Sequence, residues 1–475
     1  MTGARTGADP LRRETLLLFL LAGVQFTHIV DFMVLMPLGP QFMRRFAVSP
    51  AEFGLLVSAY TFGAAASALL AAFHVDRFDR KHAILTVYAG FVAATALCAA
   101  APGFWTLLAA RVVSGVFGGI AGAIVFTIVG DLVPDARRGR ATGIVALGFP
   151  LSAIAGVPLG LALGSAFGWR APFVAVAIVS ALLWLALYRA LPPLGAHRHG
   201  RADRAMARVR AVFGDANHRA AFALGSVLMF AGFLVIPFIS PYMVGNVGLT
   251  EADLPWMYLA GGSATLLSSQ WIGRLADRHG KTRVFRIVAV LSIAPLLITT
   301  HLPPVPVPVA IGASMLFMVL VSGRYVPALA LINGAVAPPI RGAFLVFNSA
   351  LQQLSTGLAT LVAGAVLGHE GARITHYGTA GLLAVGATIF AIVLAGRVRT
   401  CAPSGGPYLG PGAAVADGAE VDAATALGPG ACVEAGARVE GSVLGPGARV
   451  GPGARVRDAI LGAEAVVGEG ARVEP

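Results

Sequence analysis

Long apolar segments alternate with short polar segments along most of the chain. A helix needs roughly 20 mostly apolar residues to cross about 30 Å of hydrocarbon, and segments of that kind recur from Thr15 to Arg399. The pattern therefore predicts twelve membrane-spanning helices in two groups of six. They are expected at residues 15–40, 51–74, 83–101, 103–132, 141–164 and 170–190, and then at 220–245, 254–274, 284–300, 306–336, 342–367 and 377–396.

The composition supports a membrane protein. Hydrophobic residues make up 57% of the 475 residues and charged residues only 12%, and the mean hydropathy is +0.78, far more apolar than an ordinary soluble domain. We expect an all-α membrane fold with a six-helix half at 1–190, a basic linker at 191–219 and a second half at 220–399. A second linker at 400–408 leads to a tail at 409–475.

Lysine and arginine are distributed unevenly among the loops. With the N-terminus inside, the cytoplasmic segments carry 24 of them and the outer loops carry 4, which are Arg44, Arg45, Arg170 and Arg373. Because basic residues of short loops stay in the cytoplasm, both termini are expected there, in a bacterial inner membrane. The net charge of +12 then indicates contact with anionic lipids and no nucleic-acid partner.

The tail has a six-residue period. Apolar residues lead successive units from Leu409 to Val473, with two five-residue units among them, and small residues fill most other positions. Such a period is typical of a parallel β-helix, in which each apolar residue points inward. The tail resembles the left-handed hexapeptide β-helix of acyltransferases and sugar-nucleotide pyrophosphorylases. The alternative is low-complexity disorder.

Four ionisable residues stand out inside the predicted helices, where charge is costly and therefore a sign of function. They are His28 and Asp31 in the first helix, Arg111 in the fourth and Arg324 in the tenth. Helices four and ten are equivalent in a six-plus-six repeat, and each arginine needs an acidic partner, water or an anionic ligand. Asp31 is the acidic residue that we place inside a predicted span, so we expect it near Arg111. Its surroundings would differ between conformations, so it could bind and release a proton. A static ion pair and a packed His28 are the alternatives.

The fifth predicted helix is rich in glycine and proline. Gly156, Gly160 and Gly164 share one face, which allows a second helix to approach closely. The full set is Gly148, Pro150, Gly156, Pro158, Gly160 and Gly164.

Two loops carry a recurring charged motif. The stretch "GRLADRHGKTR" contains Gly273, Asp277, Arg278, Gly280 and Arg283, and "AFHVDRFDRKH" contains Asp76, Arg77, Arg80 and Lys81. Both are similar to the cytoplasmic loop motif of the major facilitator superfamily, although Ala72 and Asp79 replace two glycines in the second. The stretches "LMPLGP", "GWRAPF" and "AGVPLG" add to this resemblance, and the last is a loose form of a motif associated with antiporters of the family.

The resemblance to the major facilitator superfamily implies a secondary transporter that works by alternating access. It implies a cytoplasmic gate in which Arg80 pairs with Asp131 and Asp76 meets the start of helix eleven. Proton-coupled efflux of a small, partly apolar molecule, drug-like or sugar-like, is the expected activity. A facilitator or an uptake symporter is the alternative within the same fold.

Several side chains could line a substrate path. Aromatic residues of helix seven, among them Phe230, Phe233 and Tyr242, carry no charge and suit a partly apolar solute, although such residues often only pack. Asn348 and Gln352 lie four apart on helix eleven, where a helix-to-helix hydrogen bond is as good an explanation.

Enzymatic chemistry is not predicted. The three cysteines have no metal-ligand spacing, and Gly280-Lys281-Thr282 lacks the first glycine and the preceding strand of a phosphate-binding loop, so neither a metal nor a cofactor is expected. A membrane-tethered scaffold or transferase acting through the tail is the contrasting class, but no histidine follows His376. We expect the tail to be a module through which copies of the protein assemble, for example into a homotrimer, or an accidental fusion, rather than an enzyme.

Overall fold

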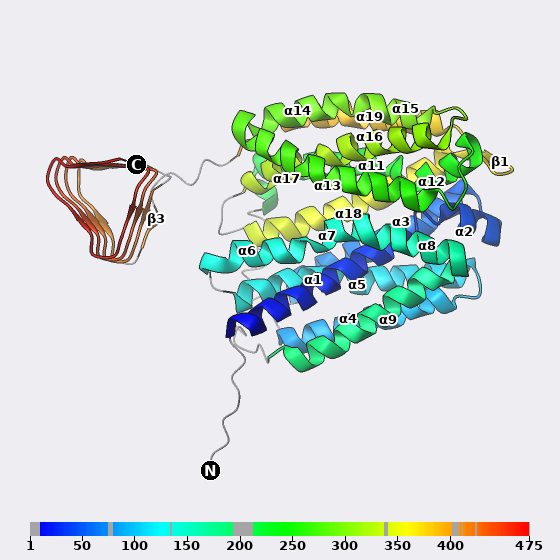
Figure 1. Cartoon of the computed structure of the whole chain (residues 1–475), viewed down its shortest axis with the longest axis horizontal. Coiled ribbons are helices and arrows are strands. Elements are labelled where there is room, and N and C mark those ends of the chain that lie inside the picture. Colours follow the sequence, from blue (N-terminus) through cyan, green and yellow to red (C-terminus); the bar gives the residue numbers. More distant parts are fainter. Residues whose placement is uncertain are drawn as a thin grey trace, which may run out of the picture. The chain divides into compact units, whose positions relative to one another are not determined.

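The computed structural model describes residues 10–74, 79–133, 135–192, 212–336, 341–400, 408–410, 412–422 and 425–474. It separates into two compact units, Met1–Arg399 and Thr400–Pro475. The first unit is a bundle of helices and the second is built of short strands (Figure 1).

The N-terminal half of the helical unit contains six long helical passages, of which the fifth is interrupted. A single π-helical turn, Ser152–Gly156, breaks this passage between Pro150 and Pro158, two residues that remove backbone donors from the helix. The helices of this half are α1 (Pro10–Val34), α2 (Gly39–Phe46), α3 (Pro50–His74), α4 (Arg80–Ala100), α5 (Phe104–Leu132), α6 (Asp135–Ala146), α7 (Gly148–Leu151), α8 (Val157–Phe167) and α9 (Arg170–Ala190).

The C-terminal half repeats this arrangement with more interruptions. Its seventh passage changes from α-helix to 3-10 turn (Ile236–Phe238) and π turn (Met243–Val247), around Pro237 and Pro241. A short antiparallel hairpin precedes the last helix. The elements are α11 (Ala216–Phe233), α12 (Ile239–Tyr242), α13 (Leu254–His279), α14 (Lys281–Leu291), α15 (Ile293–Thr300), α16 (Val307–Gly323), α17 (Tyr325–Gly334), α18 (Arg341–Val366), β1 (Gly368–Glu370), β2 (Arg373–Thr375) and α19 (Tyr377–Ala395).

Ten helical passages of the described chain are long and apolar enough to cross a membrane. The two other predicted spans are the helices α13 and α18, each 26 residues long. Both are long enough to cross, but polar side chains such as Gln270 in α13 and Gln352 in α18 lower their hydropathy. The prediction of an α-helical membrane fold is confirmed, whereas the count of twelve spans stays a prediction.

The first helix is shorter than predicted. The apolar pattern indicated one helix over 15–40, but α1 ends at Val34, a turn follows at Leu35–Leu38, and α2 runs separately to Phe46. Pro37 in this turn has no N–H for a helical hydrogen bond. The linker also ends earlier than position 219, because α11 begins at Ala216 with Asp215 as its N-cap.

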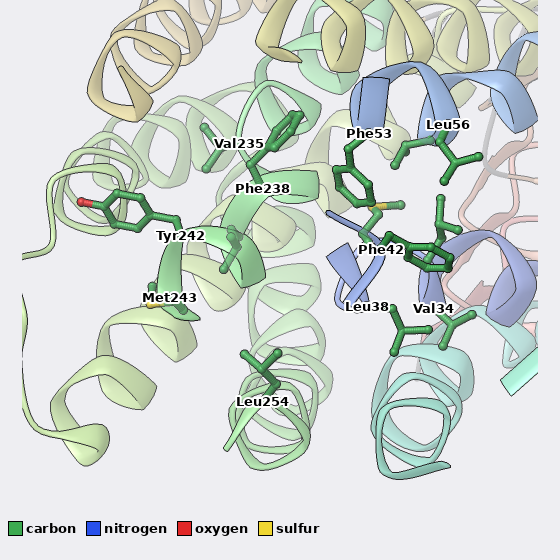
Figure 2. Close-up of a cluster of buried hydrophobic side chains, with 14 of the residues drawn as sticks. Val34, Leu38, Phe42, Phe53, Leu56, Val235, Phe238, Tyr242, Met243 and Leu254 are labelled. Atoms are coloured by element: carbon green, nitrogen blue, oxygen red, sulfur yellow. The ribbon is translucent and has the colours of Figure 1, made fainter. Parts of the chain in front are cut away.

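The two halves share one hydrophobic core at only one end of the bundle, the end that carries α2 and the β1–β2 hairpin, which we call the α2 end. There Phe53 of α3 packs edge-on against Phe238, with ring centroids 5.8 Å apart, as Figure 2 shows. The α2 residue Gly39 lies against Pro241, and Arg44 pairs with Glu251. At the opposite end each half has its own buried cluster, and only the partly buried Leu69 of α3 packs on the cluster of the C-terminal half.

The tail forms a parallel β-helix with three sheets, as the six-residue period predicted. Val415, Val433, Val450 and Val467 are paired along one sheet, so one coil takes 18 or 17 residues, and the five-residue units account for the shorter coils. Leading residues such as Leu427 and Val439 are fully buried. The sheets are β3 (Tyr408–Leu409), β6 (Ala426–Leu427), β9 (Val443–Leu444) and β12 (Ile460–Leu461); β4 (Ala414–Val415), β7 (Cys432–Val433), β10 (Arg449–Val450) and β13 (Val466–Val467); and β5 (Glu420–Val421), β8 (Arg438–Glu440), β11 (Arg455–Arg457) and β14 (Arg472–Val473).

Close packing of α3 against α5 generates a test of the helical fold. A methyl group at Gly115 would collide with the backbone of Tyr60. We expect Gly115→Ala to lower the free energy of unfolding by about 1–3 kcal/mol, the usual cost of overpacking, as measured by thermal unfolding of the purified protein in detergent.

Gly130→Ala is the matched control on the same helix, because no atom lies within 4 Å of a Cβ placed there. Alanine also favours a helix by up to about 1 kcal/mol over glycine, so this variant should be as stable as the wild type or more stable. Equal stability of the two variants would contradict the close approach of α3 and α5.

Candidate functional site

A buried ion pair joins α1 to α5 in the N-terminal half. Arg111 Nη1 donates to Asp31 Oδ2 over 2.7 Å and to the Asp31 carbonyl oxygen over 3.1 Å. Both side chains are 0% exposed. The pairing that the sequence suggested is therefore present, and it lies inside one half rather than on an open surface.

Aromatic rings surround the guanidinium of Arg111. Its Cζ atom lies 4.7 Å from the ring centre of Tyr60 and 6.0 Å from that of Phe173, so cation–π attraction adds to the ion pair. Among the described residues, Asp31 Oδ1 and Arg111 Nε and Nη2 have no hydrogen-bond partner. The two opposite charges balance each other, so the pair as a whole is neutral.

His28 lies on α1 one turn before Asp31 and faces the same helix, α5. Its Nε2 shares a hydrogen bond with Gln25 Oε1, and Gln25 Nε2 donates to the carbonyl of Gly122 on α5 over 3.4 Å. His28 is half-buried. The two residues thus share a helix face, but they contact different parts of α5.

Arg324 has no carboxylate partner among the described residues. It follows the last residue of α16 and is 1% exposed, and its Nη1 donates to Thr388 Oγ1 over 2.7 Å and to Ser292 Oγ over 3.2 Å. Arg111 and Arg324 lie at different depths along their helices. Arg111 is seven residues beyond the start of α5 and Arg324 is seventeen beyond the start of α16, or about 10 Å and about 25 Å along each helix.

Four glycines of the fifth passage face α1 or the turn after it. A Cβ added at Gly148 would touch Gln25, one at Gly156 or Gly160 would touch Val30 or Val34, and one at Gly164 would touch Leu38. The predicted close approach is therefore observed, with α1 as the partner.

The glycine face also contains a polar contact to α1 that the sequence did not predict. Ser152 lies four residues from both Gly148 and Gly156, and its hydroxyl bonds the Phe26 carbonyl on α1 over 3.0 Å. The spacing of four residues was the signal that could have identified it.

Of the first loop motif, the structure describes Arg80 and Lys81, while Asp76 and Arg77 lie outside the described residues. Arg80 Nε lies 3.2 Å from Asp131 Oδ2, which is the pairing that the family resemblance implied. It joins α4 to α5 within one half. Lys81 Nζ lies 5.8 Å from the ring centre of Tyr188.

The second loop motif forms the tight turn between α13 and α14. Gly280 adopts a φ of +89°, a backbone conformation that residues with a side chain rarely adopt. Gly273 lies on α13 near Val326. Asp277, Arg278 and Arg283 are exposed, and within the described part of the chain none of the three forms an ion pair.

The aromatic residues of helix seven divide into two groups. Phe230 and Phe233 are half-buried, and the Phe233 ring lies 6.0 Å from Phe32 of α1, across the two halves. Tyr242 is 8% exposed, packs at a tilt against Tyr377 and donates to the Leu302 carbonyl over 3.0 Å. Tyr242 therefore belongs to the core of the α2 end, and Phe230 and Phe233 are more exposed side chains packed against the same core.

A polar cluster lies between α11, α17 and α18. The Tyr325 hydroxyl donates to Gln352 Oε1 over 2.9 Å, and Asn348 lies beside Gln352 at Gly225. Asn348 Oδ1 and Gln352 Nε2 have no partner within the described chain. One acceptor and one donor are thus available to a neutral polar group.

No group of three or more histidine, cysteine, aspartate or glutamate side chains in the described ranges could hold a metal ion.

The sequence matches two protein-family models. Residues 21–233 and 221–407 match the Major Facilitator Superfamily, and residues 408–474 match the GlmU-like, C-terminal hexapeptide family. The first match covers both halves of the helical unit and the second covers the β-helix.

Two curated relatives extend this comparison. The chain is 27% identical over 396 residues to the chloramphenicol resistance protein of Streptomyces lividans, covering 82% of this chain and 98% of that protein. It is also 27% identical over 356 residues to the uncharacterized MFS-type transporter YceJ of Bacillus subtilis (strain 168), covering 73% of this chain and 88% of that protein.

Solved structures share the fold. A bacterial homolog of the human lysosomal transporter Spinster, in an inward-facing and occupied conformation, has a TM-score of 0.68 and 16% identity over 84% of this chain and all of that one. A D-xylose–proton symporter has a TM-score of 0.65 and 16% identity over 82% of this chain and 99% of that one. From residue 21 to residue 407 the chain therefore belongs to the Major Facilitator Superfamily of multi-pass membrane transporters, with a hexapeptide-repeat β-helix after it.

Proposed function

We propose that this transporter exports a small, partly apolar molecule across the bacterial inner membrane in exchange for protons. The observation that carries the proposal is the Asp31–Arg111 pair, because Asp31 is the acid that lies within an apolar span and it is completely buried. The runner-up functions are a facilitator and an uptake symporter of the same fold.

The chemistry of the pair supports proton exchange. A buried carboxylate is stabilised by the adjacent guanidinium and is destabilised by the loss of water, so a conformational change that alters either effect changes proton binding at Asp31. One proton crossing about 150 mV supplies roughly 3.5 kcal/mol, enough for a concentration ratio of a few hundredfold. His28, one turn away, would be the next group on the proton path.

The packing of the halves supports alternating access. They share a core at the α2 end and have separate cores at the other end. If the basic loops are cytoplasmic, as the charge distribution predicts, the transporter is closed to the outside in this state. The glycine face of the fifth passage lets α1 lie directly on α7 and α8, so Asp31 is tied to a helix that also adjoins α13 of the other half.

The proposed direction of transport and the proposed substrate class rest on side chains of both halves and on one relative. Phe32 and Phe233 offer apolar contact across the two halves. Inside the C-terminal half, Asn348 and Gln352 carry one hydrogen-bond acceptor and one donor without a partner in the described chain, and together these groups would suit a neutral amphipathic solute. The relative from Streptomyces lividans is a chloramphenicol resistance protein, which favours efflux over uptake.

For the tail we propose assembly of a homotrimer. The outward residues of the sheet β3–β6–β9–β12 include Ala426, Val443 and Ile460, of which the last two are 46% and 83% exposed. The outward residues of the sheet β5–β8–β11–β14 are charged, among them Arg455 and Arg472. Apolar side chains on one outer face suit burial against another copy of the tail.

The Asp31→Asn variant tests proton exchange. Asparagine keeps the size of the side chain but binds no proton in the working pH range, so proteoliposomes with an imposed proton gradient should no longer accumulate chloramphenicol or another lipophilic drug. Drug-driven proton movement should also disappear. Unchanged accumulation by this variant would contradict the proposal.

A structural role of the pair would also weaken transport, so stability is measured in parallel. Asp31→Asn leaves Arg111 buried without a counter-charge, which is expected to cost about 3–5 kcal/mol. The double variant Asp31→Asn/Arg111→Gln removes both charges and should regain much of that stability without regaining proton coupling. Recovery of coupling in the double variant would indicate that the pair only holds the helices together.

The apolar face of the tail is tested with Val443→Arg and Ile460→Arg in the full-length protein. New charges on this face should convert a trimer to a monomer, as measured by the mass of the purified protein in nanodiscs. Arg455→Ala and Arg472→Ala, on the charged face, are the controls and should leave the mass unchanged. A wild-type protein that is monomeric would rule out the trimer.

A further inference from the structure

Arg324 is a buried positive charge that no negative charge of the described residues balances. Its guanidinium is 1% exposed and lies among α14–α15, α16–α17 and α19. An arginine stays protonated at working pH, so protein packing alone leaves a net charge in a region of low dielectric. An unbalanced charge in such a place costs several kcal/mol.

The C-terminal half contains few acids, and none of them is paired with Arg324 in the described chain. Between Ala216 and Arg399 the acids are Glu251, Asp253, Asp277 and Glu370. All four lie near the ends of helices or between them, and the described part of the chain shows no ion pair to Arg324. The N-terminal half differs, because there Asp31 balances Arg111.

The side chains that bond Arg324 are neutral hydroxyls, and each is oriented by its own hydrogen bond to a backbone carbonyl. The hydroxyl of Ser292 donates to the Ala289 carbonyl and that of Thr388 donates to the Ala384 carbonyl, each over 2.7 Å. Their oxygens therefore accept from Arg324 Nη1 and supply no charge. These contacts hold one edge of the guanidinium in place.

The opposite edge of the guanidinium makes no hydrogen bond to the described residues. Arg324 Nε and Nη2 are buried and have no hydrogen-bond partner within the described chain. These two N–H groups point in the same direction from the planar group, which is the arrangement that binds an anion with two parallel hydrogen bonds.

We propose that the C-terminal half binds a small inorganic anion, with chloride as the physiological candidate, at the Nε–Nη2 edge of Arg324. The site lies inside one half and is closed to solvent, which suits a compact monovalent ion rather than a group on a larger solute. The anion balances the charge that a carboxylate balances in the other half, and it makes the packing of α16–α17 against α14–α15 and α19 dependent on anion binding.

Thermal unfolding of the purified full-length protein tests this site. Chloride replaces gluconate at constant ionic strength, so general screening does not change. Because a ligand that binds only the folded state stabilises it, the unfolding temperature of the wild type should rise with chloride and then saturate. Bromide should replace chloride, and a bromide-soaked crystal should give an anomalous peak beside Arg324 Nε and Nη2.

Arg324→Gln should abolish the chloride response, and Arg324→Lys, which keeps the charge but not the paired donors, should shift it to higher concentration. Arg286→Gln, at an exposed arginine of α14, is the matched control and should respond like the wild type. If Arg324→Gln does not fold, the lysine variant and the bromide peak decide the outcome.

A chloride-independent wild type, or a response that survives in Arg324→Gln, would overturn the proposal. Stabilisation by acetate but not by chloride or bromide would also overturn it, since that outcome would indicate a carboxylate site. The measurement needs no proton gradient and no transported solute, so its result is independent of the proton-exchange proposal.

Discussion

The buried ion pair between Asp31 and Arg111 sets the arrangement of the N-terminal half. Two charges removed from water are tolerated only when their geometry is good, so the 2.7 Å contact restricts how α1 can slide or rotate on α5. The opposite side of α1 then lies on the glycine face of the fifth passage, where a Cβ at Gly156 or Gly160 would collide with it. The position of α1 is therefore determined from both sides.

The buried arginine of the C-terminal half has different hydrogen-bond partners from those of Arg111. Arg324 lies deeper along its helix than Arg111 does, and it is held by two hydroxyls rather than by a carboxylate. The two halves thus share the order of their helices without sharing their electrostatics.

The junction between the halves is strong at one end and weak at the other. Aromatic packing of Phe53 on Phe238 and the shared cluster join them at the α2 end (Figure 2), while the opposite ends have separate cores. Because packed interfaces have discrete arrangements, closure of the second end would require the first to separate. The β-helix has its own core of leucine, valine and alanine side chains and its own set of strand pairs.

The sequence by itself determined the class of fold, the helical passages and the period of the tail, because each depends on local hydrophobicity and on spacing along the chain. The pairing of Asp31 with Arg111 and the close-packed face of Gly156, Gly160 and Gly164 were also foreseeable, since each follows from a shortage of partners or from helix geometry. Tertiary structure alone decided the early end of α1, the burial of Tyr242 against Tyr377, the contact of Ser152 with α1 and the depth of Arg324. These features depend on which helices meet, and an apolar helix that could face lipid, core or a neighbouring helix does not reveal its contacts in its own residues.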